Sequence, residues 1–167
     1  KRIESYAFQK AGLSGGISLP SSLEAMFPYA FSDSGVTEVL GAAGGSVLGN
    51  YAFQKCASLT RAVLPGRLKV VPENAFYRCA ALTSVSLPGG LESIGDGAFG
   101  SCTGLEEIEL PASLRTVGSG AFGASGLTAL KLNLGLQVID GNAFAHCAAL
   151  TEVRFPDTLQ TLGQNAF

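Results

Sequence analysis

The sequence predicts a β-solenoid, a coil of short parallel strands in which each turn of 22 or 23 residues stacks on the turn before it. Three observations lead to this prediction. The dipeptide Ala-Phe recurs at nearly constant spacing, apolar residues recur at fixed places between its copies, and proline and glycine follow the extended segments. A single short coil cannot bury its apolar side alone, so neighbouring coils must cover it.

The Ala-Phe dipeptide sets the period of the array. Successive copies are 22 or 23 residues apart, and their phenylalanines are Phe8, Phe31, Phe53, Phe76, Phe99, Phe122, Phe144 and Phe167. Such regular recurrence is the sequence signature of a repeat architecture. We therefore expect residues 1–167 to form one array of about seven repeats of 22–23 residues. Because neither end has an obvious polar cap, we also expect it to be a fragment of a longer array.

The repeat that begins at Leu82 shows the elements in order. Leu82 is followed by apolar residues three and five positions later and then by Pro88, a pattern that favours a short strand. Proline closes the strand because it lacks the N–H donor that a sheet ladder needs. Residues 91–94 form a second extended segment, and Gly95 after it can adopt positive φ at a turn. We expect 98–102, Ala-Phe-x-x-Cys, to form a single tight or 3₁₀-like turn.

Stacking explains why the same residue types recur at each place in the repeat. Neighbouring strands of a sheet are about 4.8 Å apart, so equivalent side chains of successive turns should lie above one another in columns. The phenylalanines would then form a buried aromatic spine, in which offset rings are favoured over face-to-face ones. The alanine before each phenylalanine is small because the turn packs closely.

The unit L-x-x-V-x-L-P-x-x-L-x-x-I-G-x-x-A-F-x-x-C strongly resembles the BspA-like leucine-rich repeat, and the resemblance covers essentially the whole chain. It implies a leucine-rich repeat solenoid, a curved right-handed coil with a parallel β-sheet on its concave face. Short second strands, tight or 3₁₀ turns and little α-helix would complete each repeat. Three departures are expected to loosen local packing: the glycine-rich stretch 41–45, Asn133 in place of the strand-ending proline, and Ser14 in place of the first leucine.

Composition excludes several classes of partner. The formal charge of −2 argues against a nucleic-acid backbone or an anionic membrane surface, since both require clustered Lys and Arg. The longest uncharged stretch, 39–54, has 16 residues and is broken by glycines, so it is too short to span a bilayer as a helix. We therefore expect no nucleic-acid partner, and membrane attachment only through an anchor outside this segment.

Four cysteines occupy one column of the repeat, three residues after the phenylalanine: Cys56, Cys79, Cys102 and Cys147. Other repeats carry alanine or serine at this place, which indicates a small, partly buried position rather than a reactive one. We expect reduced, structural cysteines, with a disulfide or metal site as the alternative. No C-x-x-C pair suggests zinc.

Catalytic residues are not evident. The single histidine, His146, lies beside Cys147 in a turn, where adjacent side chains point apart and no orienting partner is apparent. We interpret His146 as a surface residue. The sequence predicts neither an enzyme nor a cofactor.

The concave face is the candidate binding surface. Its outward positions vary from repeat to repeat, as they do when solenoids diversify their binding surfaces or when an unused face drifts. An acidic patch is followed by basic residues on the turns beyond it. The candidate residues are Arg61, Val63, Ser84, Ser86, Glu106, Glu107, Glu109, Lys131, Glu152 and Arg154.

Two functions from different classes are compatible with this pattern. The resemblance implies a secreted or cell-surface module that binds a protein partner, such as an extracellular-matrix or host-surface protein, in adhesion. The alternative is a structural spacer that has no ligand of its own and presents another domain. No exposed aromatic cluster, the usual anchor of an interface, is evident on the concave face.

Overall fold

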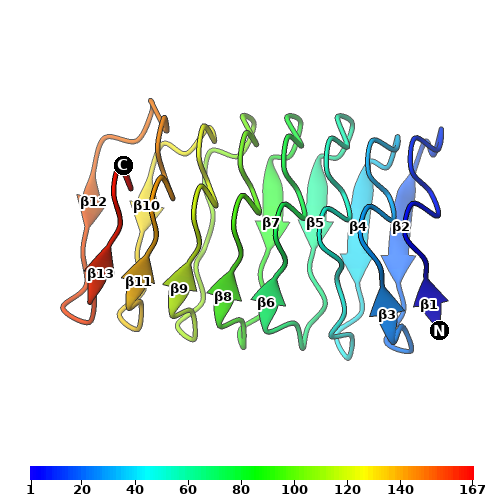
Figure 1. Ribbon diagram of the computed structural model, residues 1–167, viewed down its shortest axis with the longest axis horizontal. Helices are drawn as coiled ribbons and strands as arrows, with labels where there is room; N and C mark the ends of the chain where they lie inside the picture. Colours follow the sequence, from blue (N-terminus) through cyan, green and yellow to red (C-terminus); the bar gives the residue numbers. More distant parts are fainter.

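Each repeat folds into one turn of a coil, here called a rung, that contains up to two short strands. The computed structural model describes residues 1–167 and contains strands and turns but no helix (Figure 1). All strand pairs are parallel, and each strand pairs with its equivalent in a neighbouring rung. The predicted parallel β-solenoid of about seven turns is therefore confirmed.

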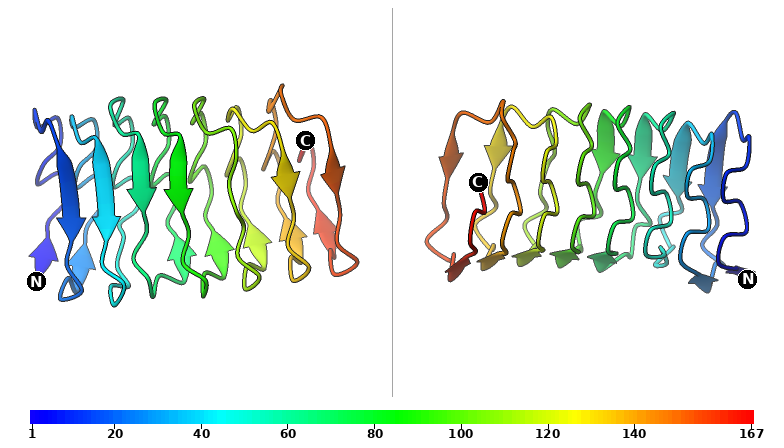
Figure 2. Two further views of the ribbon diagram at one scale, coloured as in Figure 1. Left: turned by 180° about the vertical axis from the view of Figure 1, so that it is seen from behind. Right: turned by 45° about the horizontal axis from the view of Figure 1, so that its top comes forward.

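The first strand of each repeat lies in one layer, seen from in front in the left view of Figure 2. A four-stranded sheet with the order β2-β4-β5-β7 and a two-stranded sheet β10-β12 make up this layer. The strands are β2 (Gly16–Leu19), β4 (Glu38–Gly41), β5 (Arg61–Val63), β7 (Ser84–Ser86), β10 (Leu130–Lys131) and β12 (Val153–Arg154). The outer side of this layer corresponds to the face that the repeat resemblance implies to be concave, and it is here called the concave face. Residues 106–110 lie between the two sheets without forming a strand.

The second strands form the opposite layer. Five of them make one sheet with the order β6-β8-β9-β11-β13, and two make a separate pair, β1-β3. The strands are β1 (Arg2–Ile3), β3 (Ala25–Met26), β6 (Val70–Val71), β8 (Ser93–Ile94), β9 (Thr116–Val117), β11 (Val138–Ile139) and β13 (Thr161–Leu162). The layer is interrupted at 46–49, directly after the glycine-rich stretch 41–45 that departs from the repeat.

A continuous column of phenylalanine rings runs through the coil between the layers. The ring centroids of successive rungs are 5.1–5.5 Å apart beyond Phe31, and the interplanar angles there are 2–15°. Phe53, Phe76, Phe99 and Phe122 are fully buried, as are the alanines that precede them. The predicted spine is confirmed. Burial of each interior ring contributes about 1.5–3 kcal/mol to the stability of the fold. Each ring also stacks on two neighbours.

Of the two forms that the sequence suggested for the turn around each spine phenylalanine, tight or 3₁₀-like, the structure has the tight form. The residues two positions before and two positions after the phenylalanine both have left-handed φ, between 51° and 62°, in every rung that contains them. The amides of Gly100 and Cys102 donate to the carbonyls of Gly97 and Phe99, which closes two successive tight turns. The left-handed residues Gly97 and Ser101 flank 98–100 on both sides, so no helical run extends beyond these three residues and no 3₁₀-helix forms.

Gly95 was expected to supply the positive φ, and this expectation was wrong. The left-handed glycine is Gly97, two residues later. Gly95 is required instead for close approach, because a Cβ there would lie 2.8 Å from the carbonyl oxygen of Val71 in the preceding rung. The Gly95 amide donates to that same oxygen.

Two of the expected weak points are compensated by neighbouring residues. Ser14 is exposed, and Leu13 beside it packs against the core in place of the missing leucine. Asn133, in place of proline, donates through Nδ2 to the carbonyl oxygens of Ala112 at 3.3 Å and Leu114 at 2.9 Å in the preceding rung. Asn133 therefore ties two rungs together rather than loosening them.

Candidate binding surface

The residues predicted for the concave face do share one surface. Pairing of β5 with β7 places Arg61 beside Ser84 and Val63 beside Ser86. Pairing of β10 with β12 places Lys131 beside Arg154, on the last rung of this layer. Nine of the ten predicted side chains are exposed, and Val63 is half-buried.

The threonine column at the edge of this face has a structural role. The hydroxyl of Thr60 donates to the carbonyl oxygen of Thr37 at 3.2 Å, and Thr83 donates to Thr60 in the same way. Thr128 repeats the contact to Glu106 at 3.3 Å. These hydroxyls satisfy carbonyl groups of the preceding rung, so they reinforce the stack and are less available to a ligand.

The acidic rung, residues 106–110, interrupts the sheet hydrogen bonding. Its amides make no backbone hydrogen bond to β7, and Thr128 on the next rung reaches only the carbonyl oxygen of Glu106, at 2.9 Å. A hollow of about 450 Å³ lies between β7 and this rung, where Glu107 and Glu109 line one side. The carboxylates of Glu107 and Glu109 therefore border an open hollow, and the backbone of their rung is not hydrogen-bonded to β7.

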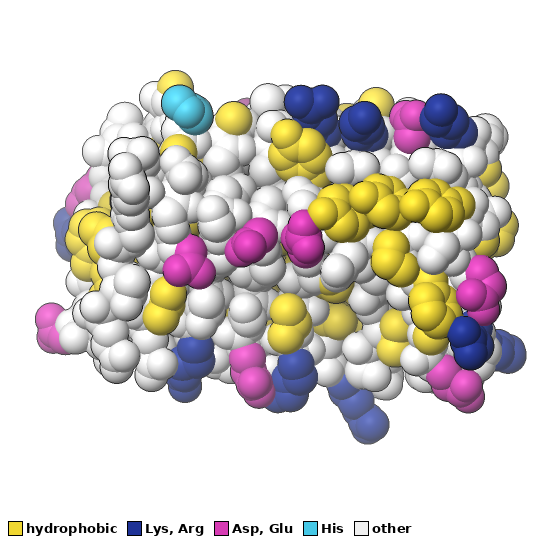
Figure 3. Space-filling view, in the orientation of Figure 1, with side chains coloured by type: hydrophobic (Ala, Val, Ile, Leu, Met, Phe, Trp, Pro, Cys, Tyr) yellow, Lys and Arg dark blue, Asp and Glu magenta, His cyan; other side chains and the backbone are white.

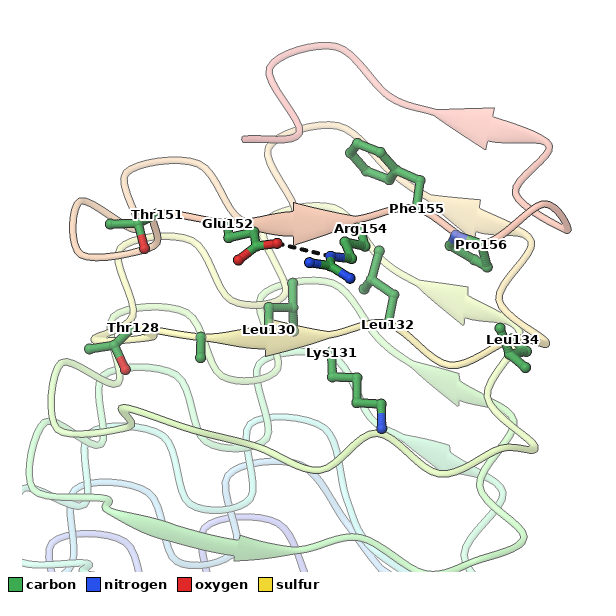
Figure 4. A pocket seen from close by; sticks show the side chains of 11 residues that line it. Thr128, Leu130, Lys131, Leu132, Leu134, Thr151, Glu152, Arg154, Phe155 and Pro156 are labelled. Atoms are coloured by element: carbon green, nitrogen blue, oxygen red, sulfur yellow. Dashed lines mark hydrogen bonds and ion pairs between the residues drawn. The ribbon is translucent and has the colours of Figure 1, made fainter.

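A larger groove, of about 540 Å³, lies over β10 and β12 (Figure 4). Two apolar side chains stand out along it, Leu134 with 84% and Phe155 with 50% of the residue exposed. The guanidinium Nε of Arg154 and the carboxylate of Glu152 form an ion pair at 2.9 Å, drawn as a dashed line in Figure 4. Lys131 has no ion-pair partner within 4 Å and also lines the hollow beside the acidic rung.

Sequence reasoning missed the apolar part of this groove. Phe155 occupies the column in which most other rungs carry a leucine, such as Leu110 and Leu132, and its larger ring is half exposed. Leu134 follows the strand at a turn position where other rungs carry small residues such as Gly89. An aromatic in a leucine column and an aliphatic residue in a turn column were the available signals.

Arg61, at the other end of the face, is already paired within the protein. Its Nη1 atom forms an ion pair with Oε1 of Glu38 on the neighbouring strand β4. The positive charge of Arg61 is therefore partly neutralised, whereas that of Lys131 is not. The unpaired positive charge of the concave face therefore lies at Lys131, next to the acidic rung.

The four cysteines are free and buried, in agreement with the structural interpretation. Each thiol donates to the carbonyl oxygen of the spine phenylalanine in the preceding rung, at 3.0–3.2 Å. Burial raises the pKa of the Cys102 thiol to about 12 and the pKa of Cys79 well above its ordinary value. Thiols with such pKa values stay protonated near neutral pH, where only a thiolate is a strong nucleophile.

The remaining titratable residues form no candidate for chemistry. No group of three or more His, Cys, Asp and Glu side chains is placed to hold a metal ion. His146 is exposed, has a left-handed backbone and makes no side-chain hydrogen bond. The chain, built of strands and turns, has no apolar helix of membrane-spanning length.

The stacked rungs, the phenylalanine spine and the variable outer face define a leucine-rich repeat protein. The chain belongs to the BspA type leucine-rich repeat family, since the six-copy model of that repeat region matches residues 1–91 and 69–167. This confirms the family resemblance noted from the repeat unit. Proteins of this family are typically non-enzymatic.

Solved structures of bacterial leucine-rich repeat proteins share the fold. One from Treponema pallidum superposes with a TM-score of 0.81 at 28% identity, over 97% of this chain and 77% of that protein. One from Bacteroides ovatus gives 0.75 at 25% identity, over 100% of this chain and 55% of that protein. A leucine-rich cell surface protein of Faecalibacterium prausnitzii gives 0.56 at 24% identity, over 95% and 52%. The chain thus spans about half the length of the last two. A comparison with curated proteins found no match.

Proposed function

We propose that this chain is a protein-binding module of a cell-surface or secreted protein, and that it acts in adhesion to host or matrix proteins through its concave face. The observation that carries the proposal is the groove over β10 and β12. There the exposed side chains of Leu134 and Phe155 lie beside the unpaired cation of Lys131. Exposed apolar groups rimmed by charges are typical of a protein-interaction site.

The arrangement of charges supports binding of a specific partner rather than non-specific association. The carboxylates of the acidic rung lie next to Lys131, so the face presents opposite charges on neighbouring rungs. Charges at the rim of an interface steer association and reject partners with the wrong pattern, while apolar groups supply most of the affinity. A partner would therefore present a basic segment opposite Glu107 and Glu109 and an apolar group opposite Phe155.

The surface location is also part of the proposal. It is supported by the family, and by the fact that a protein of the same fold from Faecalibacterium prausnitzii is a leucine-rich cell surface protein. Free buried cysteines do not oppose this location, because thiols packed against the spine are protected from oxidants by burial.

A structural spacer is the second candidate function. The continuous phenylalanine spine and the five-stranded second layer favour it, because both stiffen the coil without using the concave face. A spacer requires no ligand, so its concave residues should tolerate replacement without any loss of binding. The two candidates are therefore separated by a binding measurement.

The experiment measures binding of the folded chain to immobilised extracellular-matrix and plasma proteins at low and at high salt. Two variants test the face: charge reversal of Glu106, Glu107 and Glu109 to lysine, and Phe155→Ser. We expect saturable binding that the reversal changes in affinity and in salt dependence, and that Phe155→Ser weakens by about tenfold or more. Reversal of the three exposed carboxylates should leave the unfolding midpoint nearly unchanged.

The matched control exchanges an ion pair in the second layer, Lys69→Glu together with Glu92→Lys. Nζ of Lys69 lies 2.8 Å from the carboxylate of Glu92 and lowers its pKa, and the exchange keeps both charges on the opposite side of the coil. Its binding should match that of the natural sequence. No saturable binding by a folded chain, or equal weakening by the control, would contradict the adhesion proposal and favour a spacer.

A further inference from the structure

Three tyrosines stand where the backbone favours other residues. The position two residues before each spine phenylalanine is left-handed in all eight rungs, and five of the rungs carry asparagine or glycine there. Those residue types adopt left-handed φ most readily, whereas a bulky side chain is disfavoured. The three N-terminal rungs instead carry Tyr6, Tyr29 and Tyr51, the tyrosine ladder.

The ladder is stacked and partly exposed. The ring centroids of Tyr6 and Tyr29 are 5.2 Å apart and those of Tyr29 and Tyr51 are 4.6 Å apart, with interplanar angles of 7° and 14°. Because the rings cover one another's faces, they present their edges and hydroxyl groups to solvent. Tyr51 donates its hydroxyl to the carboxylate of Glu73, while the hydroxyls of Tyr6 and Tyr29 have no partner within the chain.

A row of cations lies beside the ladder at the second left-handed position of the turn. This basic row consists of Lys10, Lys55 and Arg78, all exposed and all without a carboxylate within 4 Å. Asp33 is the one acidic residue in the same column of these rungs. On the face opposite the concave sheet, Figure 3 shows a row of yellow side chains in the N-terminal half, with dark-blue side chains along the edge above it.

Stability of the fold does not account for the ladder. Stacking contributes at two ring contacts, but three residues bear the backbone penalty, and asparagine at the equivalent positions of later rungs avoids that penalty. The later rungs also fill the second left-handed column with Ser101, Ala124 and His146, so the fold does not require cations there. Because five rungs form the same turn without tyrosine at this position, the three strained tyrosines are candidates for function.

We propose that the tyrosine ladder and the basic row bind an extended acidic peptide segment of a partner protein, on a surface separate from the concave face. Three features of the surface favour an electron-rich partner: ring edges carry partial positive charge, the free hydroxyls of Tyr6 and Tyr29 donate hydrogen bonds, and the row is cationic. Glu73, the acidic residue at the end of the ladder, already accepts the hydroxyl of Tyr51. Rigid tyrosines supply contact area at low entropic cost and are typical of protein-binding surfaces. Asp33 opposes such a partner and weakens its binding.

The test uses the folded chain and fluorescently labelled poly-L-glutamate, with affinity measured by fluorescence anisotropy at low and at high salt. The double variant Tyr6→Asn with Tyr29→Asn removes the ladder and places a residue suited to left-handed φ at both positions. We expect it to weaken binding about tenfold or more, and circular dichroism should show an unchanged fold. Lys55→Gln should weaken binding several-fold, and Asp33→Asn should strengthen it.

Lys69→Gln is the matched control, because it removes the same charge from the second layer, away from the basic row. It should bind nearly as the natural sequence does. The proposal is overturned by any of three results: no binding of poly-L-glutamate, equal losses for Lys55→Gln and Lys69→Gln, or unchanged affinity in the tyrosine variant. Tyrosine-independent binding of dextran sulfate with equal affinity would also overturn it, since the surface would then be a general anion site. None of these results bears on the concave face, which has its own variants.

Discussion

The thiol of Cys102 donates a hydrogen bond to the carbonyl oxygen of Phe76, 3.2 Å away in the preceding rung. That oxygen also accepts the amide of Cys79, at 3.1 Å, which closes the turn of its own rung. The cysteine column is thus bonded to the backbone of the phenylalanine spine, rung by rung. A thiol in this place satisfies a buried carbonyl and fills space at the same time.

Stability should fall in alkaline solution because of these thiols. The folded chain raises the pKa of Cys102 from 9.0 to about 12, so it holds the proton more tightly than the unfolded chain does. The stabilisation is complete below about pH 9 and is lost as the pH rises toward 12, by an amount on the order of 4 kcal/mol for Cys102. Denaturant titrations at neutral and alkaline pH measure this loss.

Cys102→Ala is the control for this alkaline effect. Alanine occupies the same column at Ala11, so the variant should fold, and its free energy of unfolding should depend less on pH above about 9. The prediction fails if both proteins lose the same stability between neutral and alkaline pH.

Removal of an interior ring should open a cavity in the spine. Phe99 is fully buried between the rings of Phe76 and Phe122, so Phe99→Ala should lower the free energy of unfolding by about 3–5 kcal/mol. Phe8→Ala is the comparison, because Phe8 is 42% exposed. Its replacement should lower the free energy of unfolding clearly less. Guanidinium titration of both variants provides the measurement, and equal midpoints would show that burial does not set the cost.

The spine and the columns could be predicted from the sequence because burial repeats with the period of the chain. Phe99 and Cys102 recur as residue types in nearly every rung, and a single unit therefore reveals the inside of the coil. The left-handed turn positions could not be predicted, because tyrosine, lysine and arginine occupy several of them in place of glycine or asparagine. Local residue identity pointed to Gly95, whereas the geometry selects Gly97.

The binding surface was predictable only in part, for a related reason. Alternation along the strands indicates which side chains face outward, so the charged residues of the concave face could be named. Whether a hollow forms on this face depends on the backbone hydrogen bonds between strands. The absence of these bonds between β7 and the acidic rung cannot be recognised from the residue types. The exposure of Phe155 likewise depends on how the rungs around it pack.

Gly95 and Gly120 should respond differently to an added side chain. Gly95→Ala places a Cβ 2.8 Å from the Val71 carbonyl oxygen and 3.0 Å from the Glu73 amide nitrogen, so two rungs must separate, at a cost of about 1–3 kcal/mol. Gly120 has left-handed φ and open space, and asparagine occupies its column at Asn142. Gly120→Asn should therefore change stability little. Thermal unfolding of the two variants tests the distinction, and equal shifts in midpoint would refute it.

Restoring the proline of the repeat at position 133 should destabilise the chain. In two other rungs a hydroxyl two residues after the proline donates to a pair of carbonyl oxygens in the rung before, as Ser113 does to Gly89 and Leu91. Thr158 makes the same pair of bonds, at 2.8 Å each, to Leu134 and Leu136.

In the rung of Asn133 the corresponding residue is Gly135, which has no side chain, and the Asn133 amide supplies the bonds instead. Asn133→Pro removes the nearer donor to the Leu114 carbonyl oxygen and leaves only the more distant Nη1 of Arg115, at 3.5 Å, so we expect a loss of about 1–2 kcal/mol, although the residue returns to the family pattern. Ser113→Ala, which removes the equivalent donor where proline is already present, should cost a similar amount in the same denaturant titration. A stabilised Asn133→Pro variant would show instead that strand-end rigidity outweighs the carbonyl bonds.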